Sequence, residues 1–245
     1  MRNIKIILEY DGTNYYGWQY QKNTNKTIQQ TLEKKLTKLN KSEVSVIGSG
    51  RTDSGVHAKC QTANFYLDVD IPASRIPIAL NSMLPPDIIC KDAKEVADDF
   101  HARYDSKAKK YRYRLLNRSY HSVFTRNYVY TLYKDLNLEK INSALKDFVG
   151  YYDFAAFQSA GSDVVNTKRK IKKFEMKYIG EEICFDIVGT GFLYNMVRII
   201  IGTLIEIGLN KRPENDVKRI INSCNRREAG FTAPAKGLTL LEVYY

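Results

Sequence analysis

With 245 residues, 44% of them hydrophobic and 27% charged, the chain has the composition of an ordinary folded protein and the length for one large domain or two smaller ones. Its four cysteines form no CxxC pair and its histidines number only three, which excludes a zinc site of the usual spacing and a dense disulfide framework. A net charge of +11 and 18 tyrosines favour a nucleic-acid partner, because cations displace counterions from phosphates and exposed rings stack on bases.

The first half alternates short strands with helices. Apolar residues of period two predict an opening strand, with Ile4, Ile6 and Leu8 on one face. Thr27 and Gln30 form a capping-box pattern that predicts the start of a helix. The remaining expected elements are a strand at 44–48, a strand with Ala63, Phe65, Leu67 and Val69 on one face, a short helix around 73–82 and a strand near 87–97. Together they give a β-α-β-β-α-β order, the split βαβ arrangement.

The second half repeats this plan with additions. We expect a strand at 110–116, a helix at 138–149, a hairpin of strands 173–178 and 182–188, helices at 192–208 and 213–222, and a closing strand at 237–245. The fold class is therefore α+β, with one half at 1–104 and the other at 105–245. We expect the two antiparallel sheets to lie side by side around a central RNA-binding cleft.

The apolar segment 192–208 is the only stretch that invites comparison with a membrane span. It has 17 residues, and Arg198 lies near its middle, so it is short and costly for a bilayer. We expect a buried helix instead. The opening residues 1–12 carry charges within their apolar run, which is not typical of a signal peptide. We therefore expect a cytoplasmic protein without a membrane partner.

The stretch GSGRTDSGVHA, residues 48–58, places one carboxylate on a glycine-rich turn. Asp53 stands between Arg51 and His57, and two interpretations are open. Asp and Gly are common turn formers, so Asp53 fits a residue that only caps its own backbone. Alternatively, the turn presents Asp53 for chemistry, since a lone ionised carboxylate can act as a covalent nucleophile toward an electrophilic carbon.

The strand KKYRYRLL, residues 109–116, interleaves rings with cations. This pattern suits unpaired nucleotides, with a ring for each base and a cation for each phosphate. A half-buried strand with solvated cations explains it equally well. Tyr111, Tyr113 and Leu115 share one face, and Lys110, Arg112 and Arg114 share the other.

A polar stripe runs along the apolar segment 192–208. It consists of Asn195, Arg198, Gly202 and Glu206. A buried arginine needs a partner, and a pair of Arg198 with Asp53 keeps the carboxylate ionised by lowering its pKa. The sequence contains no GxxxxGK[ST] or GxGxxG motif, and its histidines lie far apart. The expected chemistry therefore needs neither metal nor organic cofactor.

Six segments in register resemble tRNA pseudouridine synthases of the TruA family, over essentially the whole chain. The loop 48–58 is similar to the catalytic loop of that family. The others are YDGTNYYGWQYQ (10–21), HARYDSKAKKYRYRL (101–115), DFAAFQSAGS (153–162), GTGFLYNMVR (189–198) and GLTLLEV (237–243). The departures are mild: Ser49 and Ser54 replace common alanines, which puts loop packing in question, and Thr239 replaces a usual aromatic.

The resemblance implies an isomerase that converts uridine to pseudouridine at positions 38 to 40 of the tRNA anticodon stem-loop. Asp53 is then the catalytic aspartate, acting on a flipped nucleotide. Tyr111 stacks on the target uracil, Arg198 pairs with Asp53, and Arg51 helps to extrude the base. Leu238 is a candidate for an apolar wall of the pocket. The resemblance also implies a homodimer that works without a cofactor.

Two rival functions remain open at this stage. One is a paralogue with the same chemistry on other uridines, in tRNA or ribosomal RNA. The other is a non-catalytic RNA-binding protein that uses the same sheets as passive platforms. For His57 and His101 we expect positions in a loop or in the core rather than a catalytic role.

Overall fold

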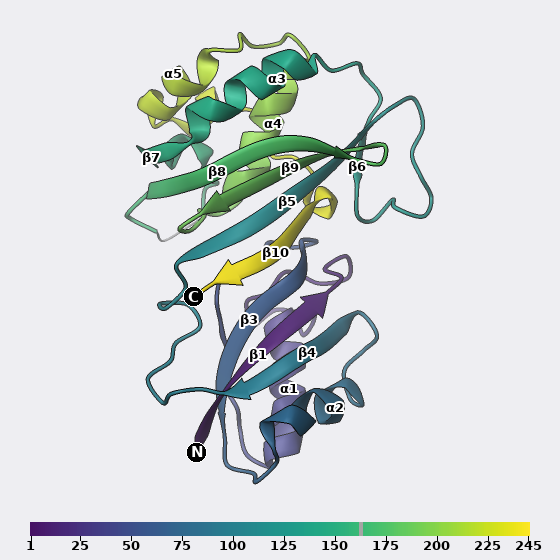
Figure 1. Cartoon of the computed structure of the whole chain (residues 1–245), viewed down its shortest axis with the longest axis vertical. Coiled ribbons are helices and arrows are strands. Elements are labelled where there is room, and N and C mark those ends of the chain that lie inside the picture. The colour runs from purple at the N-terminus through teal and green to yellow at the C-terminus, as the bar shows by residue number, and fades with distance from the viewer. Residues whose placement is uncertain (162–163) are drawn as a thin grey trace. The chain divides into compact units, whose positions relative to one another are not determined.

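The computed structural model describes residues 1–161 and 164–245, and it divides the chain into two compact units (Figure 1). Unit 1 comprises Met1–Lys107 together with Thr239–Tyr245, and unit 2 comprises Ala108–Leu238. Both combine strands with helices, so the expected α+β class is confirmed. The closing strand packs with unit 1, whereas the sequence interpretation assigned it to the second half. The division into domains at 104 and 105 stays a prediction.

Unit 1 is built on an antiparallel sheet in the order β4-β1-β3. The apolar face of β1 (Arg2–Tyr10) is fully buried, as the period-two pattern predicted. The capping residue Thr27 accepts a hydrogen bond from the Gln30 amide, which starts the first helix as expected. The other elements of this unit are α1 (Ile28–Asn40), β2 (Ile47–Gly48), β3 (His57–Leu67), α2 (Ile76–Asn81), β4 (Ile88–Glu95) and β10 (Leu238–Tyr244).

The second edge of β3 is completed by two short pairings. β2 pairs antiparallel with it near Asn64, and β10 pairs parallel with it through Thr239 and Leu240, opposite His57 and Ala58. The strand β10 thereby covers the edge of β3 directly after the loop 48–58. Pairing protects an edge that otherwise exposes unsatisfied amides and carbonyls.

The polar face of this sheet is also covered. Asn3 and Asn64 are both fully buried, and the Asn64 amide group donates to the Asn3 side-chain oxygen over 3.0 Å. Asn3 donates to the carbonyl oxygens of Ala97 and Phe100, and Asn64 accepts from the Ala102 amide. These bonds fasten the segment 97–102 across the strands, which explains how polar side chains can be buried here without penalty.

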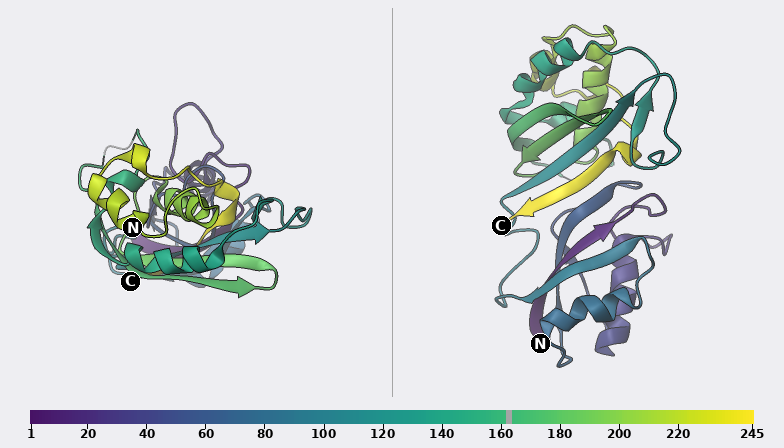
Figure 2. Two further views of the ribbon diagram at one scale, coloured as in Figure 1. Left: turned by 90° about the horizontal axis from the view of Figure 1, so that it is seen from above. Right: turned by 45° about the vertical axis from the view of Figure 1, so that its right-hand side comes forward.

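Unit 2 has an antiparallel sheet in the order β5-β9-β8-β7, with β6 added parallel to β5. Two further views of its strands and helices are shown in Figure 2. The strands are β5 (Ala108–Asn117), β6 (Tyr130–Leu132), β7 (Gly150–Asp153), β8 (Lys168–Ile179) and β9 (Glu182–Gly189), and the helices are α3 (Leu138–Leu145), α4 (Met196–Gly208) and α5 (Asp216–Ser223).

Several elements differ from those expected: α3 ends at Leu145 rather than at 149, and β8 begins at Lys168 rather than at 173. The helix α4 begins at Met196 rather than at 192, because Asn195 adopts a left-handed conformation with φ of 59° before the first turn. The strands β6 and β7 were not expected. Single 3₁₀ turns cover Ala73–Arg75, Lys146–Phe148, Ala155–Phe157, Arg226–Glu228 and Ala235–Gly237. The last residue of the motif 153–162 lies outside the described residues. Within the described chain, no helix has both the length and the apolar character to cross a membrane.

Candidate active site

The backbone of the loop 48–58 is closed into a tight turn at Asp53. The Val56 amide donates to the Asp53 carbonyl oxygen over 3.1 Å, and Gly55 takes a positive φ of 77° within this turn. Only glycine adopts that conformation without steric cost. The side chain of Asp53 is partly buried, whereas Arg51 is exposed. The turn therefore fixes where the carboxylate leaves the backbone.

The motif 10–21 packs directly on this turn through two glycines. A Cβ atom on Gly12 would lie 2.0 Å from the Val56 carbonyl oxygen, and one on Gly17 would lie 2.6 Å from the Thr52 carbonyl oxygen. Neither position tolerates a side chain, because the atoms it would meet belong to the backbone. At the end of the same motif, Gln19 accepts a hydrogen bond from Nε of Arg51 over 3.1 Å.

Behind the turn lies a group of buried neutral side chains, which we call the loop-support network: Tyr10, Ser49, Thr52 and Gln61. Gln61 is fully buried and donates to the Gly50 carbonyl oxygen over 2.8 Å. It also accepts a hydrogen bond from the Ser49 hydroxyl over 2.6 Å, while the hydroxyls of Tyr10 and Thr52 bond each other at 2.8 Å. Burial raises the pKa of Tyr10, so its hydroxyl stays neutral.

Ser49 and Ser54, which depart from the family pattern, both find partners inside unit 1. Ser49 bonds Gln61, and the Ser54 hydroxyl donates to the Tyr15 carbonyl oxygen over 3.2 Å. The sequence interpretation left loop packing in question at these two positions. Each hydroxyl instead adds one hydrogen bond to the packing of the loop.

Gln61 is a supporting residue that the sequence interpretation missed, although a signal was present. In the sequence of β3 every second residue from Ala63 onward is apolar, and Ala63 and Phe65 on this face are fully buried. Gln61 lies two residues before Ala63 and therefore on the same face of the strand. A glutamine on the apolar face of a strand needs buried partners, because an unsatisfied buried amide costs free energy.

The two histidines beside these motifs bind backbone amides. Nδ1 of His57 accepts a hydrogen bond from the Gly12 amide over 3.1 Å, and the ring is buried. Nδ1 of His101 accepts from the amides of Arg103 and Tyr104, each over 3.2 Å. Both imidazoles thus stabilise turns, in agreement with the expectation of loop and core positions.

In unit 2, Tyr111 lies on β5 and is 6% exposed. Its ring packs edge-on against Phe192, with centroids 5.2 Å apart and planes at 87°. Phe192 precedes α4 on the segment 189–195, so the motif 189–198 supports the position of Tyr111. This contact with Phe192 therefore fixes the orientation of the Tyr111 ring.

The cations on the other face of β5 are paired with carboxylates. Arg112 donates to both oxygens of Asp186 at 2.6 and 2.8 Å, and Arg114 does the same to Glu182 at 2.6 and 2.8 Å. β5 is half-buried as expected, but Arg112 and Arg114 are ion-paired rather than simply solvated. Phosphate binding by these cations stays a prediction. Burial of Asp186 acts to raise its pKa, but hydrogen bonds from Arg112 and Lys177 outweigh burial and hold the pKa well below its usual range.

Arg198 is oriented by two hydrogen bonds within unit 2. Its Nη1 donates to Oδ1 of Asn195 over 2.7 Å, and its Nε donates to the Ala233 carbonyl oxygen over 2.7 Å. Asn195 in turn donates to the Ser159 hydroxyl over 2.9 Å. The guanidinium plane is thus fixed by an acceptor on each of two chain segments.

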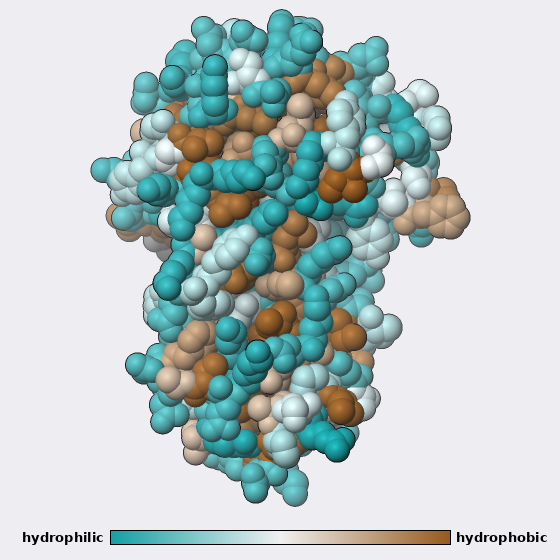
Figure 3. Space-filling model, viewed as in Figure 1, coloured by the Kyte–Doolittle hydropathy of each residue, from teal (hydrophilic) through white to brown (hydrophobic). Residues whose placement is uncertain are grey.

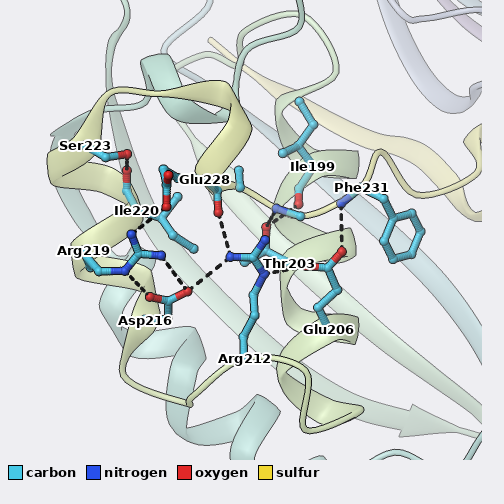
Figure 4. A network of polar contacts seen from close by, with 12 residues as sticks. Ile199, Thr203, Glu206, Arg212, Asp216, Arg219, Ile220, Ser223, Glu228 and Phe231 are labelled. Atoms are coloured by element: carbon cyan, nitrogen blue, oxygen red, sulfur yellow. Dashed lines mark hydrogen bonds and ion pairs between the residues drawn. The ribbon is translucent and has the colours of Figure 1, made fainter.

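The remaining residues of the polar stripe hold the segment that contains Ala233. A Cβ atom on Gly202 would lie 1.7 Å from the Phe231 carbonyl oxygen, so only glycine allows this approach. Glu206 accepts from the Phe231 amide, and Arg212 binds both Glu206 and the Glu228 carbonyl oxygen (Figure 4). These contacts therefore hold in place the backbone segment whose Ala233 carbonyl binds Arg198.

The residues named from the sequence are distributed over the two units. Arg51 and Asp53 belong to unit 1, whereas Tyr111, Arg198 and Leu238 belong to unit 2. Leu238 is 4% exposed and begins β10. That these five side chains form one site stays a prediction. Among the described residues, no cluster of three His, Cys, Asp or Glu side chains is arranged to hold a metal ion.

Comparison with known proteins identifies the family. A family model described as tRNA pseudouridine synthase matches residues 6–105 and 144–245. The tRNA pseudouridine synthase A of Acetivibrio thermocellus is 48% identical over 245 residues, and that of Thermoanaerobacter sp. strain X514 is 46% identical, each covering 100% of both chains. The chain belongs to the tRNA pseudouridine synthase family. The expected class of enzyme, an isomerase acting on tRNA uridines, is thereby confirmed.

Among solved structures, an archaeal box H/ACA sRNP Nop10–Cbf5 complex aligns with a TM-score of 0.40 at 13% identity. The alignment covers 98% of this chain and 48% of that chain. This likeness is too remote to support a conclusion about activity.

Proposed function

We propose that the enzyme converts uridine to pseudouridine at positions 38 to 40 of the tRNA anticodon stem-loop, with Asp53 as the catalytic carboxylate. Membership of the family supports the reaction. The observation that carries the role of Asp53 is the loop-support network together with Gly12 and Gly17, which hold the backbone on both sides of one carboxylate in a single geometry.

In the proposed reaction the target nucleotide is first flipped out of the stem. Asp53 then attacks either the uracil ring or the ribose C1′ carbon, and both routes lead to the same exchange of bonds. The N1–C1′ bond breaks, the base rotates while it is held, and a C5–C1′ bond forms. The C5 proton leaves to solvent and N1 gains a proton, so atoms and charge balance without a cofactor.

The other proposed residues assist binding and charge. Tyr111 stacks on the flipped uracil, and Leu238 forms an apolar wall beside it. Arg198 pairs with Asp53 and keeps the carboxylate ionised, while Arg51 occupies the space that the base leaves. Flipping costs a few kcal/mol, of which base–aromatic stacking recovers about 1–3 kcal/mol. Phosphate contacts of the basic protein supply the remainder.

The setting of the reaction is also part of the proposal. We place the enzyme in the cytoplasm as a homodimer, so that one tRNA contacts both subunits. The reaction as proposed needs only the protein and its RNA. A paralogue with the same chemistry on other uridines is the main alternative, and it differs from the proposal only in the uridines that react.

Release of tritium from tRNA transcripts labelled with [5-³H]uridine tests the chemistry, because the new C5–C1′ bond expels the C5 hydrogen. Wild-type protein is expected to release tritium, and Asp53→Asn to release none while it still binds tRNA. Equal release by both proteins would remove Asp53 from the mechanism. No release by wild type would leave a non-catalytic RNA-binding protein or an enzyme that acts on a different RNA.

The target positions are tested with transcripts in which uridines 38, 39 and 40 are each replaced by cytidine. Loss of tritium release with these replacements supports the anticodon stem-loop as the substrate. Undiminished release from a transcript without uridine at any of the three positions would instead establish the paralogue.

A further inference from the structure

The loop between β5 and β6, residues 118–129, carries apolar side chains that the fold does not bury. We call it the β5–β6 loop. Phe124 is 90% exposed, Tyr120 is 62% exposed and Val123 is 56% exposed. In the space-filling view this loop ends in hydrophobic surface at the margin of unit 2 (Figure 3). Single exposed apolar residues are common, but three within five residues of one loop indicate a binding surface.

The charges around this surface indicate what it binds. Residues 118–134 contain three Lys or Arg, five aromatic residues and no carboxylate. Arg126 and Lys134 are exposed. A segment that joins exposed rings with exposed cations complements nucleic acid, because rings stack on bases and cations meet phosphates. The family already supplies such a partner, since its substrate is tRNA.

The loop has a defined shape before any partner binds. β6 pairs with the end of β5, and Asn117 donates to the carbonyl oxygens of Leu132 and Lys134 at 3.0 and 2.8 Å, which closes the neck of the loop. Val129 is buried, and its amide donates to the Thr125 carbonyl oxygen over 3.0 Å. A turn held in this way projects Phe124 at little further cost in entropy on binding.

Two further contacts hold the cation nearest the neck. The Arg118 guanidinium lies 4.2 Å from the centroid of the Tyr120 ring, and it forms an ion pair with the exposed Glu181 at 2.7 Å. The Arg118 side chain therefore supports the ring of Tyr120 from one side. Arg126 lies on the turn itself, two residues after Phe124.

The loop is connected to the proposed site by a rigid strand. β5 carries Tyr111 and ends at Asn117, directly before the loop. Six residues of extended strand lie between Tyr111 and Arg118, which corresponds to about 20 Å of strand. That distance equals about six stacked nucleotides at ~3.4 Å each. An RNA whose uridine reaches Tyr111 is thus long enough to reach this loop as well.

We propose that the β5–β6 loop is a second contact for tRNA, in which Phe124 stacks on an unpaired nucleobase and Arg126 meets a neighbouring phosphate. This inference rests on the proposed function, because it requires that tRNA is the substrate. It adds a recognition element outside the catalytic loop, and this element contributes to binding rather than to the chemical step.

The test compares tRNA affinity and turnover of full-length wild type, Phe124→Ala and Phe124→Trp. Phe124→Ala is expected to raise the Kd for tRNA at least about 5-fold, the factor that corresponds to ~1 kcal/mol of stacking. At saturating tRNA its kcat is expected to match wild type, so the loss falls on KM. Phe124→Trp keeps a ring for stacking and is expected to restore the affinity.

Ile78→Ala is the matched control, since Ile78 is 62% exposed on α2 of unit 1 and its loss is expected to leave affinity unchanged. A wild-type Kd for Phe124→Ala would overturn the inference. So would an affinity loss that appears only together with a change in oligomeric state, because the loop would then be a contact between protein copies. In both cases tritium release by wild type would still uphold the proposed function.

Discussion

The loop that carries Asp53 and the strand that carries Tyr111 are both held by buried polar side chains, but of opposite kinds. Behind Asp53 the support is neutral, since Gln61, Ser49 and the Tyr10 hydroxyl exchange hydrogen bonds without a formal charge. On β5 the support is ionic, with Asp186 bound by Arg112 and Lys177 at 2.6 and 2.9 Å.

The neutral and the ionic support differ in their effect on the charge of neighbouring groups. A buried charge beside a carboxylate shifts the pKa of that carboxylate, so a neutral network leaves the pKa of Asp53, the proposed catalytic residue, undisturbed. The face of β5 that carries Arg112 has no such requirement, because it lies on the opposite side of the strand from Tyr111. Neutral support should therefore govern activity, and ionic support should govern stability and its response to acid.

Asp186→Asn is expected to have the largest effect on stability, because it removes the centre of the ionic support. Asp186 is 1% exposed and faces three cations, Lys110, Arg112 and Lys177. Neutralising it leaves those cations crowded together, which we expect to lower the free energy of unfolding by about 3 kcal/mol. Urea denaturation measures this loss, with Glu175→Gln as a control because Glu175 is 34% exposed. An equal loss in both variants would contradict the special role of Asp186.

The same variant predicts a dependence on pH. The pKa of Asp186 in the folded protein is held well below its usual range, so its stabilisation is present at neutral pH. It should decline as the pH falls below about 4, the usual pKa of an unfolded aspartate, toward the folded pKa. The difference in unfolding free energy between wild type and Asp186→Asn is therefore expected to shrink in acid. A gap that stays constant from pH 7 to about pH 3 would show that the carboxylate charge is not its cause.

Gln61→Leu removes the centre of the neutral support. The Gly50 carbonyl and the Ser49 hydroxyl both lose a buried partner, which we expect to cost about 2 kcal/mol of stability. Because the turn at Asp53 loses its anchor, kcat in the tritium assay should fall below that of the less stable Asp186→Asn, measured where both are folded. If Asp186→Asn lost as much kcat as Gln61→Leu, the division into functional and structural support would fail.

Ser49→Ala should have the smallest effect. It restores the residue that is common in the family pattern and removes one hydrogen bond to Gln61, so we expect about 1 kcal/mol or less. Gln61 keeps its bond to the Gly50 carbonyl, and kcat should remain near wild type. Thermal unfolding measured beside Gln61→Leu provides the comparison, and a drop as large as that of Gln61→Leu would make Ser49 the principal anchor.

Local sequence patterns predicted most of the helices and strands, and motif resemblance predicted the family. Period-two spacing found the strands around Ile6 and Phe65, and the capping pattern at Thr27 found the first helix. The short strands β6 and β7 escaped because three or four residues carry no periodicity. The left-handed turn at Asn195 escaped because the apolar run begins before the helix does.

Sequence patterns could not predict contacts between residues that are far apart in the chain. Nothing near Arg112 indicates that its carboxylate stands 74 residues later in the chain, at Asp186. The same holds for Arg198 and Ala233, which are joined through a backbone carbonyl that has no sequence signature. Motif resemblance could name Asp53, but the residues that hold its turn became visible only when β3 and the motif 10–21 were placed around it.

The pairing of β10 with β3 has a consequence for the order in which the protein is made. Domains generally fold as the ribosome delivers them, N-terminal parts first. Unit 1, however, lacks Thr239–Tyr245 until all of unit 2 has been synthesised. Until then the edge of β3 at His57 and Ala58, directly before which the loop carries Asp53, has no parallel neighbour. A prematurely terminated chain therefore carries every residue of the loop 48–58 and still lacks the strand that completes its support.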